Sequence, residues 1–256
     1  MFLKDQKNFF LYNGYCIFES YISKERLTVI ESAIENLVLD EGEEAGSEGS
    51  DHKNRVRRLC NLFTKGQVFE EVGIEPLSLE FTKLVIGNEI YWQAMNFHDP
   101  IPGKQEAHQS IHTDRSFFPN SEAYINVCWV IDEMTYENGA TRIVPGSHRG
   151  PWPKDVLKEN ESYGVIENEI YAECPAGSLI FIHGDTWHGG RANYSDSTRR
   201  VIHVGYGCSK TPPQQDISST ISREAKNRLC KYISLIPKPL KSFGLENNWI
   251  SKKIFK

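Results

Sequence analysis

The sequence has no long apolar run. A membrane-spanning helix needs roughly 18 consecutive apolar residues, and no stretch of the 256 residues approaches that length. The first residues, MFLKDQKNFF, carry charges where a signal peptide would have its apolar stretch. We therefore expect a cytoplasmic protein that has no membrane as a partner.

The sequence also lacks an excess of basic residues. It holds 29 Lys and Arg against 34 Asp and Glu, for a formal net charge of −5, whereas nucleic-acid binders concentrate positive charge. Its six cysteines lie far apart, without a CxxC pair or the clustering of disulfide-rich and zinc-ribbon chains. We expect no nucleic-acid partner and reduced, mostly packed thiols, and the sequence makes no prediction of oligomeric state.

What the sequence does have is the composition of an ordinary globular protein. Hydrophobic residues make up 39% of it and aromatic residues 11%, which is enough to bury a substantial core. A length of 256 residues suits one domain. We predict a single domain with a helical N-terminal region at 1–88, a strand-rich core at 89–208 and a helical tail at 209–256.

The N-terminal region shows two helical patterns. Apolar residues recur at helical spacing from Leu27 to Leu37 after Ser23, which suits an N-cap. A second helix is predicted within 76–87. Between them, residues 40–51 hold six acidic residues and three glycines, a composition that offers no core contacts to offset the entropy of ordering. We expect this acidic segment to be mobile and to close over the site as a lid.

From residue 89 onward the sequence consists of short segments rich in Ile, Val, Tyr, Trp and Phe, separated by turn residues. Many short strands without alternating long helices favour a sandwich or a double-sheet jelly roll. The predicted strands lie near residues 89–97, 110–114, 124–132, 140–145, 170–174, 178–184 and 199–207.

The first candidate for chemistry is His112-Thr113-Asp114. Side chains at i and i+2 of a strand point to the same face, so the imidazole and the carboxylate can converge on one metal ion. The tripeptide alone is a weak signal, because a surface Asp beside a His has the same spacing. The pattern also occurs a second time, at His183-Gly184-Asp185.

The second candidate is the stretch 176–200. It has the pattern of a buried strand and a turn, followed by His188 at the start of a Gly-rich loop that runs to Arg199 and Arg200. Two imidazoles and one carboxylate make the facial triad of non-haem Fe(II), which leaves coordination positions open. A 2-oxo acid can fill two of them, and its far carboxylate is best held by the planar fork of an Arg.

These residues carry a family resemblance. The order HTD (112–114), ENGATRIVPGSHRG (137–150) and PAGSLIFIHGDTWHGGRANYSDSTRR (175–200) resembles the phytanoyl-CoA dioxygenase family of Fe(II)- and 2-oxoglutarate-dependent oxygenases, over roughly residues 8–208. The segment 138–148 is its most specific element. The resemblance implies a mainly β fold with flanking helices and a double-stranded β-helix (jelly-roll, cupin-like) core.

Transferred residue by residue, the resemblance implies that His112, Asp114 and His188 are the iron ligands. It implies that Arg199, eleven positions after His188, pairs with the distal carboxylate of 2-oxoglutarate. Arg200 is the alternative for that role, on the opposite strand face.

Two further residues are assigned to the co-substrate pocket. Trp129 matches a tryptophan that lines the pocket in the family, although it could equally be a core aromatic. His183 is expected beside the site as a pocket group. A ligand set of His183, Asp185 and His203 is disfavoured, because it would leave the PGSH hairpin unrelated to the site.

The implied reaction uses Fe(II), O2 and 2-oxoglutarate, with succinate and CO2 as co-products. It would hydroxylate an unactivated C–H bond of a small molecule, such as an amino acid, a natural product or another polar metabolite. Arg115, Phe117, Phe118 and Arg191 are candidates to face the substrate. The alternatives are an acyl-CoA hydroxylase of the same family and a non-redox, metal-binding cupin-like module.

Overall fold

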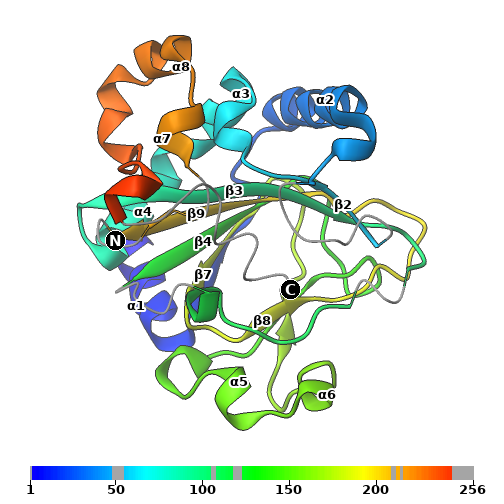
Figure 1. The fold of residues 1–256 in the computed structure, drawn as a ribbon. Coiled ribbons are helices and arrows are strands. Elements are labelled where there is room, and N and C mark those ends of the chain that lie inside the picture. Colours follow the sequence, from blue (N-terminus) through cyan, green and yellow to red (C-terminus); the bar gives the residue numbers. More distant parts are fainter. Residues whose placement is uncertain are drawn as a thin grey trace.

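Two β-sheets face each other in the computed structural model, which describes residues 2–47, 55–104, 108–117, 123–208, 212–213 and 216–243 (Figure 1). The major sheet is antiparallel, in the order β1-β7-β4-β9-β3-β2, and the minor sheet has the order β6-β5-β8. This mainly β core with flanking helices confirms the predicted fold class. The strands are β1 (Tyr15–Phe18), β2 (Val56–Leu59), β3 (Ile90–Pro100), β4 (Tyr124–Val130), β5 (Thr141–Ile143), β6 (Ile170–Tyr171), β7 (Leu179–His183), β8 (His188–Gly190) and β9 (Val201–Cys208).

Helices cover the outside of this double sheet. In Figure 1, α2, α3, α7 and α8 lie on the side of the major sheet that faces away from β8, whereas α5 and α6 lie beyond the minor sheet. No helix in the described ranges is both long and apolar enough to cross a membrane. The helices are α1 (Phe2–Asn13), α2 (Lys24–Glu41), α3 (Gln67–Gly73), α4 (Pro76–Ile86), α5 (Pro153–Val156), α6 (Glu159–Ser162), α7 (Ile217–Thr220) and α8 (Arg223–Arg228); the 3-10 turns are η1 (Gly42–Glu44), η2 (Leu62–Thr64), η4 (Asp114–Phe117), η5 (Ser147–Arg149), η6 (Cys230–Leu235) and η7 (Leu240–Phe243).

Helix α2 begins where its sequence signals predict. The Ser23 side chain accepts a hydrogen bond from the Arg26 amide at 3.3 Å, and the apolar stripe of the helix is buried against the sheet. Helix α4 also matches its prediction, with Pro76 in the first turn. Both predictions hold because caps and helical periodicity are local properties of the chain.

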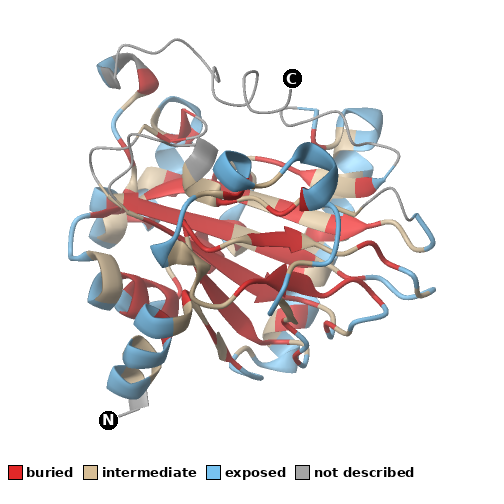
Figure 2. Cartoon of the chain, turned by 90° about the horizontal axis from the view of Figure 1, so that it is seen from below, coloured by how far each residue is buried: buried red, intermediate tan, exposed pale blue. Residues whose placement is uncertain are grey.

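Most strand residues are buried (Figure 2), because both faces of the major sheet are covered. Alternation of side chains along the strands divides the core into two parts. We call them the outer core, between the major sheet and its helices, and the inner core, between the two sheets. Strand residues of the outer core include Ile125, Val127, Trp129, Leu179, Phe181, Ile202 and Val204. Strand residues of the inner core include Cys128, Val130, Ile143, Ile180, Ile182 and Val201.

The sequence predicted a helical N-terminal region, but the structure shows that this region is not wholly helical. It supplies β1 and β2, the two edge strands of the major sheet, and α1 precedes them. Each of these strands has only four residues, too few to show a period against the helical pattern around them. Residues 40–44 of the acidic segment continue α2 and form η1, and residues 48–51 lie outside the described ranges. Its mobility and its role as a lid stay predictions.

The expected strand at 110–114 does not form. Within it, only His112 makes a β-bridge, with His188, and Asp114 starts the 3-10 turn η4. The argument from strand alternation for this pair was therefore wrong in its geometry. The turn after His112, rather than a shared strand face, sets the direction of the Asp114 side chain.

Candidate metal centre

His112, Asp114 and His188 come together between the two sheets. Each offers one ligand atom, and these atoms lie within 4.8 Å of one another. The two histidines exchange both backbone hydrogen bonds of their bridge, at 2.9 and 3.0 Å, and their rings lie side by side, tilted by 53°, with centroids 4.5 Å apart. Asp114 Oδ2 is 3.6 Å from His188 Nε2. The three predicted ligands thus form one compact cluster.

Hydrogen bonds to backbone oxygens fix both imidazole rings. His112 Nδ1 lies 2.9 Å from the carbonyl oxygen of Ser110, and His188 Nδ1 lies 2.9 Å from that of Thr186. A carbonyl only accepts, so each Nδ1 carries the proton and each Nε2 keeps its lone pair. Carbonyl partners of this kind orient metal-binding histidines. The donor set therefore fits a metal ion bound through two Nε2 atoms and the Asp114 carboxylate.

The electrostatics of the cluster favour a bound cation. Burial, together with the neighbouring His188, lowers the pKa of His112 to about 4. Burial alone would raise the pKa of Asp114, but the histidines and the Asn126 amide outweigh it and hold that pKa at about 2. Burial also acts to lower the pKa of His188, but the Asp114 carboxylate outweighs it and raises the value. The site thus keeps an ionised carboxylate beside imidazoles.

The two glycines after His188 let the ligand segments approach closely. Gln109 and Gly190 are joined by two hydrogen bonds of 2.8 Å, one from the Gln109 amide and one to its side chain. A Cβ at Gly189 would lie 3.0 Å from the Ser110 carbonyl oxygen. The first three residues of the Gly-rich segment, predicted as a loop, therefore form the strand β8. Its glycines make room for the segment that carries His112.

The PGSH turn holds the residue before His188. The Ser147 hydroxyl donates to the Val144 carbonyl at 2.6 Å and accepts from the Trp187 amide at 2.8 Å. Gly146 has a φ of 78°, a backbone conformation that favours glycine. The most specific part of the sequence pattern thus has a physical role beside the cluster.

Arg199 and Arg200 point to opposite sides of the major sheet. Arg199 is 4% exposed, and one of its terminal nitrogens lies 3.6 Å from where a Cβ would stand at Gly190, on the minor sheet. Its Nε is buried without a hydrogen-bond partner in the described part of the chain, and burial lowers its pKa to about 10. Arg200 instead pairs outside with Asp132 at 2.7 Å and with Glu31 at 3.4 Å. Of these two arginines, Arg199 is the one that presents its charge to the inside.

Two residues assigned to the co-substrate pocket face the other way. Trp129 belongs to the outer core, with Val127 and Leu179. The His183 ring lies 6.2 Å from the ring of Phe10, an outer-core residue of α1. Odd-numbered residues of β4 and β7 point toward the helices, so Trp129 takes the core position that the sequence left open as its alternative. A role for His183 beside the site stays a prediction.

Two of the four substrate candidates, Arg115 and Arg191, contact neighbouring side chains. Arg115 Nη1 donates to Asp185 Oδ2 at 2.7 Å. The Arg191 guanidinium lies between the rings of Tyr136 and Tyr194, at 3.7 and 4.3 Å from their centroids. Both arginines are thus occupied by neighbours. The side chain of Phe117 and the whole of Phe118 lie outside the described ranges.

Sequence reasoning missed Asn126 and overlooked His203 as a neighbour of the cluster. The Asn126 amide donates to Asp114 Oδ2 at 3.1 Å and lies 3.5 Å from His203 Nδ1. Cys128 Sγ lies 3.4 Å from the same nitrogen. Burial, followed by the charge of Arg199, lowers the pKa of His203 to about 3, so its ring is neutral. Alternation along β4 and β9 was the signal that could have found them.

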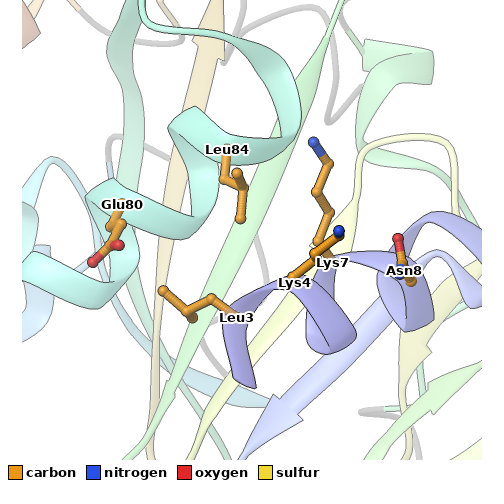
Figure 3. A pocket seen from close by; sticks show the side chains of 6 residues that line it. All are labelled: Leu3, Lys4, Lys7, Asn8, Glu80 and Leu84. Atoms are coloured by element: carbon orange, nitrogen blue, oxygen red, sulfur yellow. The ribbon is translucent and has the colours of Figure 1, made fainter. Parts of the chain in front are cut away.

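A separate groove lies between α1 and α4 (Figure 3). It is lined by Leu3, Lys4, Lys7, Asn8, Glu80 and Leu84, so none of the three clustered residues belongs to it. Its side chains offer no imidazole or thiol for a transition metal.

Comparison with known families agrees with this geometry. The sequence profile of the phytanoyl-CoA dioxygenase (PhyH) family matches residues 10–201, which include all three clustered residues and Arg199. The chain belongs to the phytanoyl-CoA dioxygenase family. The family that the order of motifs resembles is therefore confirmed.

Individual relatives cover different shares of the chain. Dioxygenase aneA of Aspergillus aculeatus is 32% identical over 166 residues, or 59% of this chain and 53% of that protein. The peroxisomal phytanoyl-CoA dioxygenase of Rattus norvegicus is 22% identical, over 88% of this chain and 76% of that protein. This chain spans about half the length of aneA and of other fungal dioxygenases that it matches.

A solved structure supports the fold. The nogalamycin carbocyclase SnoK, described as non-heme and α-ketoglutarate-dependent, shares the fold with a TM-score of 0.69 at 20% sequence identity, over 86% of this chain and 90% of that one.

Proposed function

We propose that this member of the PhyH family is an Fe(II)- and 2-oxoglutarate-dependent dioxygenase that hydroxylates an unactivated C–H bond of a small molecule. His112, Asp114 and His188 hold the iron, and Arg199 binds the distal carboxylate of 2-oxoglutarate. Iron supplies the activation of O2, coupled to decarboxylation of the co-substrate to succinate and CO2. The residues of this chain hold, orient and enclose the reactants.

One observation carries the proposal: the three-residue cluster shares the space between the sheets with an arginine whose Nε has no hydrogen-bond partner in the described part of the chain. The cluster by itself suits zinc as well as iron. A buried arginine whose Nε has no partner in the described ranges is costly unless a ligand supplies one. A dicarboxylate that binds the metal at one end supplies that partner at the other end, so the pair of features favours a 2-oxo acid enzyme over a zinc module.

The neighbours of the cluster support this division of roles. Asn126 holds the Asp114 carboxylate at 3.1 Å, which orients it toward the two imidazoles. The Arg199 amide donates to the carboxylate of Asp99 at 3.1 Å, and this hydrogen bond holds the backbone of Arg199 in place. Burial keeps water from competing for the guanidinium, which strengthens its pairing with an anion.

The substrate is proposed to be a polar metabolite, such as an amino acid or a natural product. Support comes from the polar groups Asn126 and His203 between the sheets. An acyl-CoA is the alternative, because the rat relative is a phytanoyl-CoA dioxygenase. A cytoplasmic location is part of the proposal, and the six free cysteines agree with a reducing compartment.

The test uses purified protein loaded anaerobically with Fe(II). Titration with 2-oxoglutarate is expected to produce a visible metal-to-ligand absorption band. Admission of O2 is then expected to release succinate, faster with at least one member of a panel of amino acids, polar natural products and acyl-CoAs. Bound zinc, with neither band nor succinate, would overturn the proposal in favour of a non-redox metal module.

A further inference from the structure

The connection between β7 and β8, residues 184–187, touches the segments that carry two of the three clustered residues. The Gly184 carbonyl accepts from the amide of Arg115 at 2.8 Å, and Arg115 directly follows Asp114. The Thr186 carbonyl accepts from His188 Nδ1 at 2.9 Å. A single four-residue connection therefore contacts both His188 and the residue that follows Asp114.

Asp185, in the middle of this connection, adds side-chain contacts. Its Oδ2 accepts from Arg115 Nη1 at 2.7 Å and its Oδ1 accepts from Trp152 Nε1 at 3.0 Å. Its amide donates to His183 Nδ1 at 3.1 Å, which closes a tight turn. The Asp185 side chain is 12% exposed, so its bond to the guanidinium is charge-assisted and largely shielded from water. The second HxD pattern of the sequence is thus an organised turn without an assigned role.

Asp114 needs such support because its own element is short. It starts η4, a 3-10 turn of four residues, and 3-10 hydrogen bonds hold a chain less firmly than those of an α-helix. The carboxylate itself accepts from the Asn126 amide and lies beside His188. Through its side chain, Arg115, the residue after Asp114, is tied to Asp185 in the connection between β7 and β8.

We propose that Asp185 is a positioning residue for the metal centre: by holding Arg115, it fixes the turn that aims the Asp114 carboxylate at the metal. This inference rests on the proposed function only in that Asp114 binds a metal. It also gives Arg115 a role as the link between Asp185 and Asp114 in place of contact with substrate. Loss of a partner that orients a metal ligand costs about 10–100-fold in metal affinity. Asp185 acts through Arg115, so we expect the lower end, about 10-fold.

The experiment is a Co(II) titration of the metal-free protein, followed by visible absorption and calorimetry. Asp185→Asn keeps the shape and removes the charge, and it is expected to weaken Co(II) binding about 10-fold and to change the absorption of the bound Co(II). Arg115→Gln removes the other charge of the same ion pair, at a side chain that is 23% exposed. The double variant should bind no more weakly than either single variant, because both remove one interaction.

Two controls separate positioning from general stability. Glu70→Gln breaks the bidentate pair between Glu70 and Arg228, which joins α3 to α8 far from the cluster in sequence. It should lower the unfolding temperature and leave Co(II) affinity unchanged. Trp152→Phe removes the indole donor to Asp185 but keeps the Arg115–Asp185 pair, and it should change affinity less than Asp185→Asn does.

The outcomes are distinguishable. Co(II) affinities of Asp185→Asn and Arg115→Gln within twofold of the unmodified chain would overturn the role of Asp185, even if both variants were less stable. Failure of the unmodified chain to bind Co(II) would instead overturn the proposed function, and the inference with it. Weaker binding in both variants, with Glu70→Gln unchanged, supports the inference.

Discussion

The two faces of the major sheet differ in kind although they are built from the same strands. The outer face is almost wholly apolar and packs on the helices through residues such as Trp129 and Phe181. The inner face mixes apolar residues with Asn126, His203 and, just before β9, Arg199. Its polar groups face the cluster, whereas the charges beyond the outer face pair with helix α2. The comparison shows that the outer face of the major sheet provides most of the apolar packing, whereas its inner face presents polar groups to the cluster.

Neighbouring residues show the division most clearly. Cys128 faces His203 inside, and Trp129 packs outside. Arg199 faces the minor sheet, and Arg200 pairs with Asp132 on the other side. Because the side-chain period of a strand is 2, one step along the chain moves a residue from one role to the other. Variants of adjacent residues are therefore the sharpest tests.

The largest expected effect is loss of a clustered residue on the inner side. His188→Ala and Asp114→Ala should each lower turnover by more than about 100-fold, since loss of an outer partner of a ligand already costs 10–100-fold. The measurement is succinate release with Fe(II) and 2-oxoglutarate. Arg26→Gln, which breaks a half-exposed ion pair with Glu71, is the control and should keep its activity. Near-normal rates in both alanine variants would contradict the assignment of the cluster.

On the outer face, Trp129→Ala should lower the free energy of unfolding by about 3–5 kcal/mol, because it opens a large cavity in a packed core. The measurement is chemical denaturation. Trp129→Phe keeps most of the volume, and its 2-oxoglutarate affinity should match that of the unmodified chain. A clear loss of 2-oxoglutarate affinity in Trp129→Phe would return this residue to the pocket and break the comparison.

The arginine pair comes next. Arg199→Ala should weaken 2-oxoglutarate binding roughly 10- to 150-fold, because a hydrogen bond to a charged group contributes about 1.5–3 kcal/mol. Lysine at this position should rescue only part of the loss, since it lacks the planar fork. The measurement is the anaerobic titration of the visible band. Arg200→Ala should bind 2-oxoglutarate normally, and a loss there instead would mean that the faces are assigned the wrong way round.

The smallest effect is expected at the helix layer beyond the outer face. Ser23→Ala removes the N-cap of α2 and should cost about 1 kcal/mol of stability, without change in succinate release. Ser23→Thr is the matched control, because threonine keeps the hydroxyl acceptor. Denaturation midpoints of the three chains check it, and an activity loss in Ser23→Ala would show that the helix layer and the inner face are coupled.

Features set by neighbouring residues could be predicted from the sequence. The cap at Ser23 and the apolar stripe of α2 are local features. The segments rich in β-branched and aromatic residues that form β3, β4, β7 and β9 are local as well. The strands that were missed, β1, β2 and β8, have three or four residues and owe their pairing to distant partners. In β8, the glycines that indicate a loop are the residues that a close approach requires.

For the site, the sequence by itself determined which residues gather: the order of HTD, PGSH and the His188 segment identifies the family and nominates His112, Asp114, His188 and Arg199. Only the tertiary structure decided how they gather. A bridge between His112 and His188, with a 3-10 turn at Asp114, replaces the expected shared strand face. It also decided that Trp129 and His183 face the outer side. The physical reason is that a strand fixes the alternation of its side chains, whereas the layer that covers each face is chosen by packing against residues far away in the sequence.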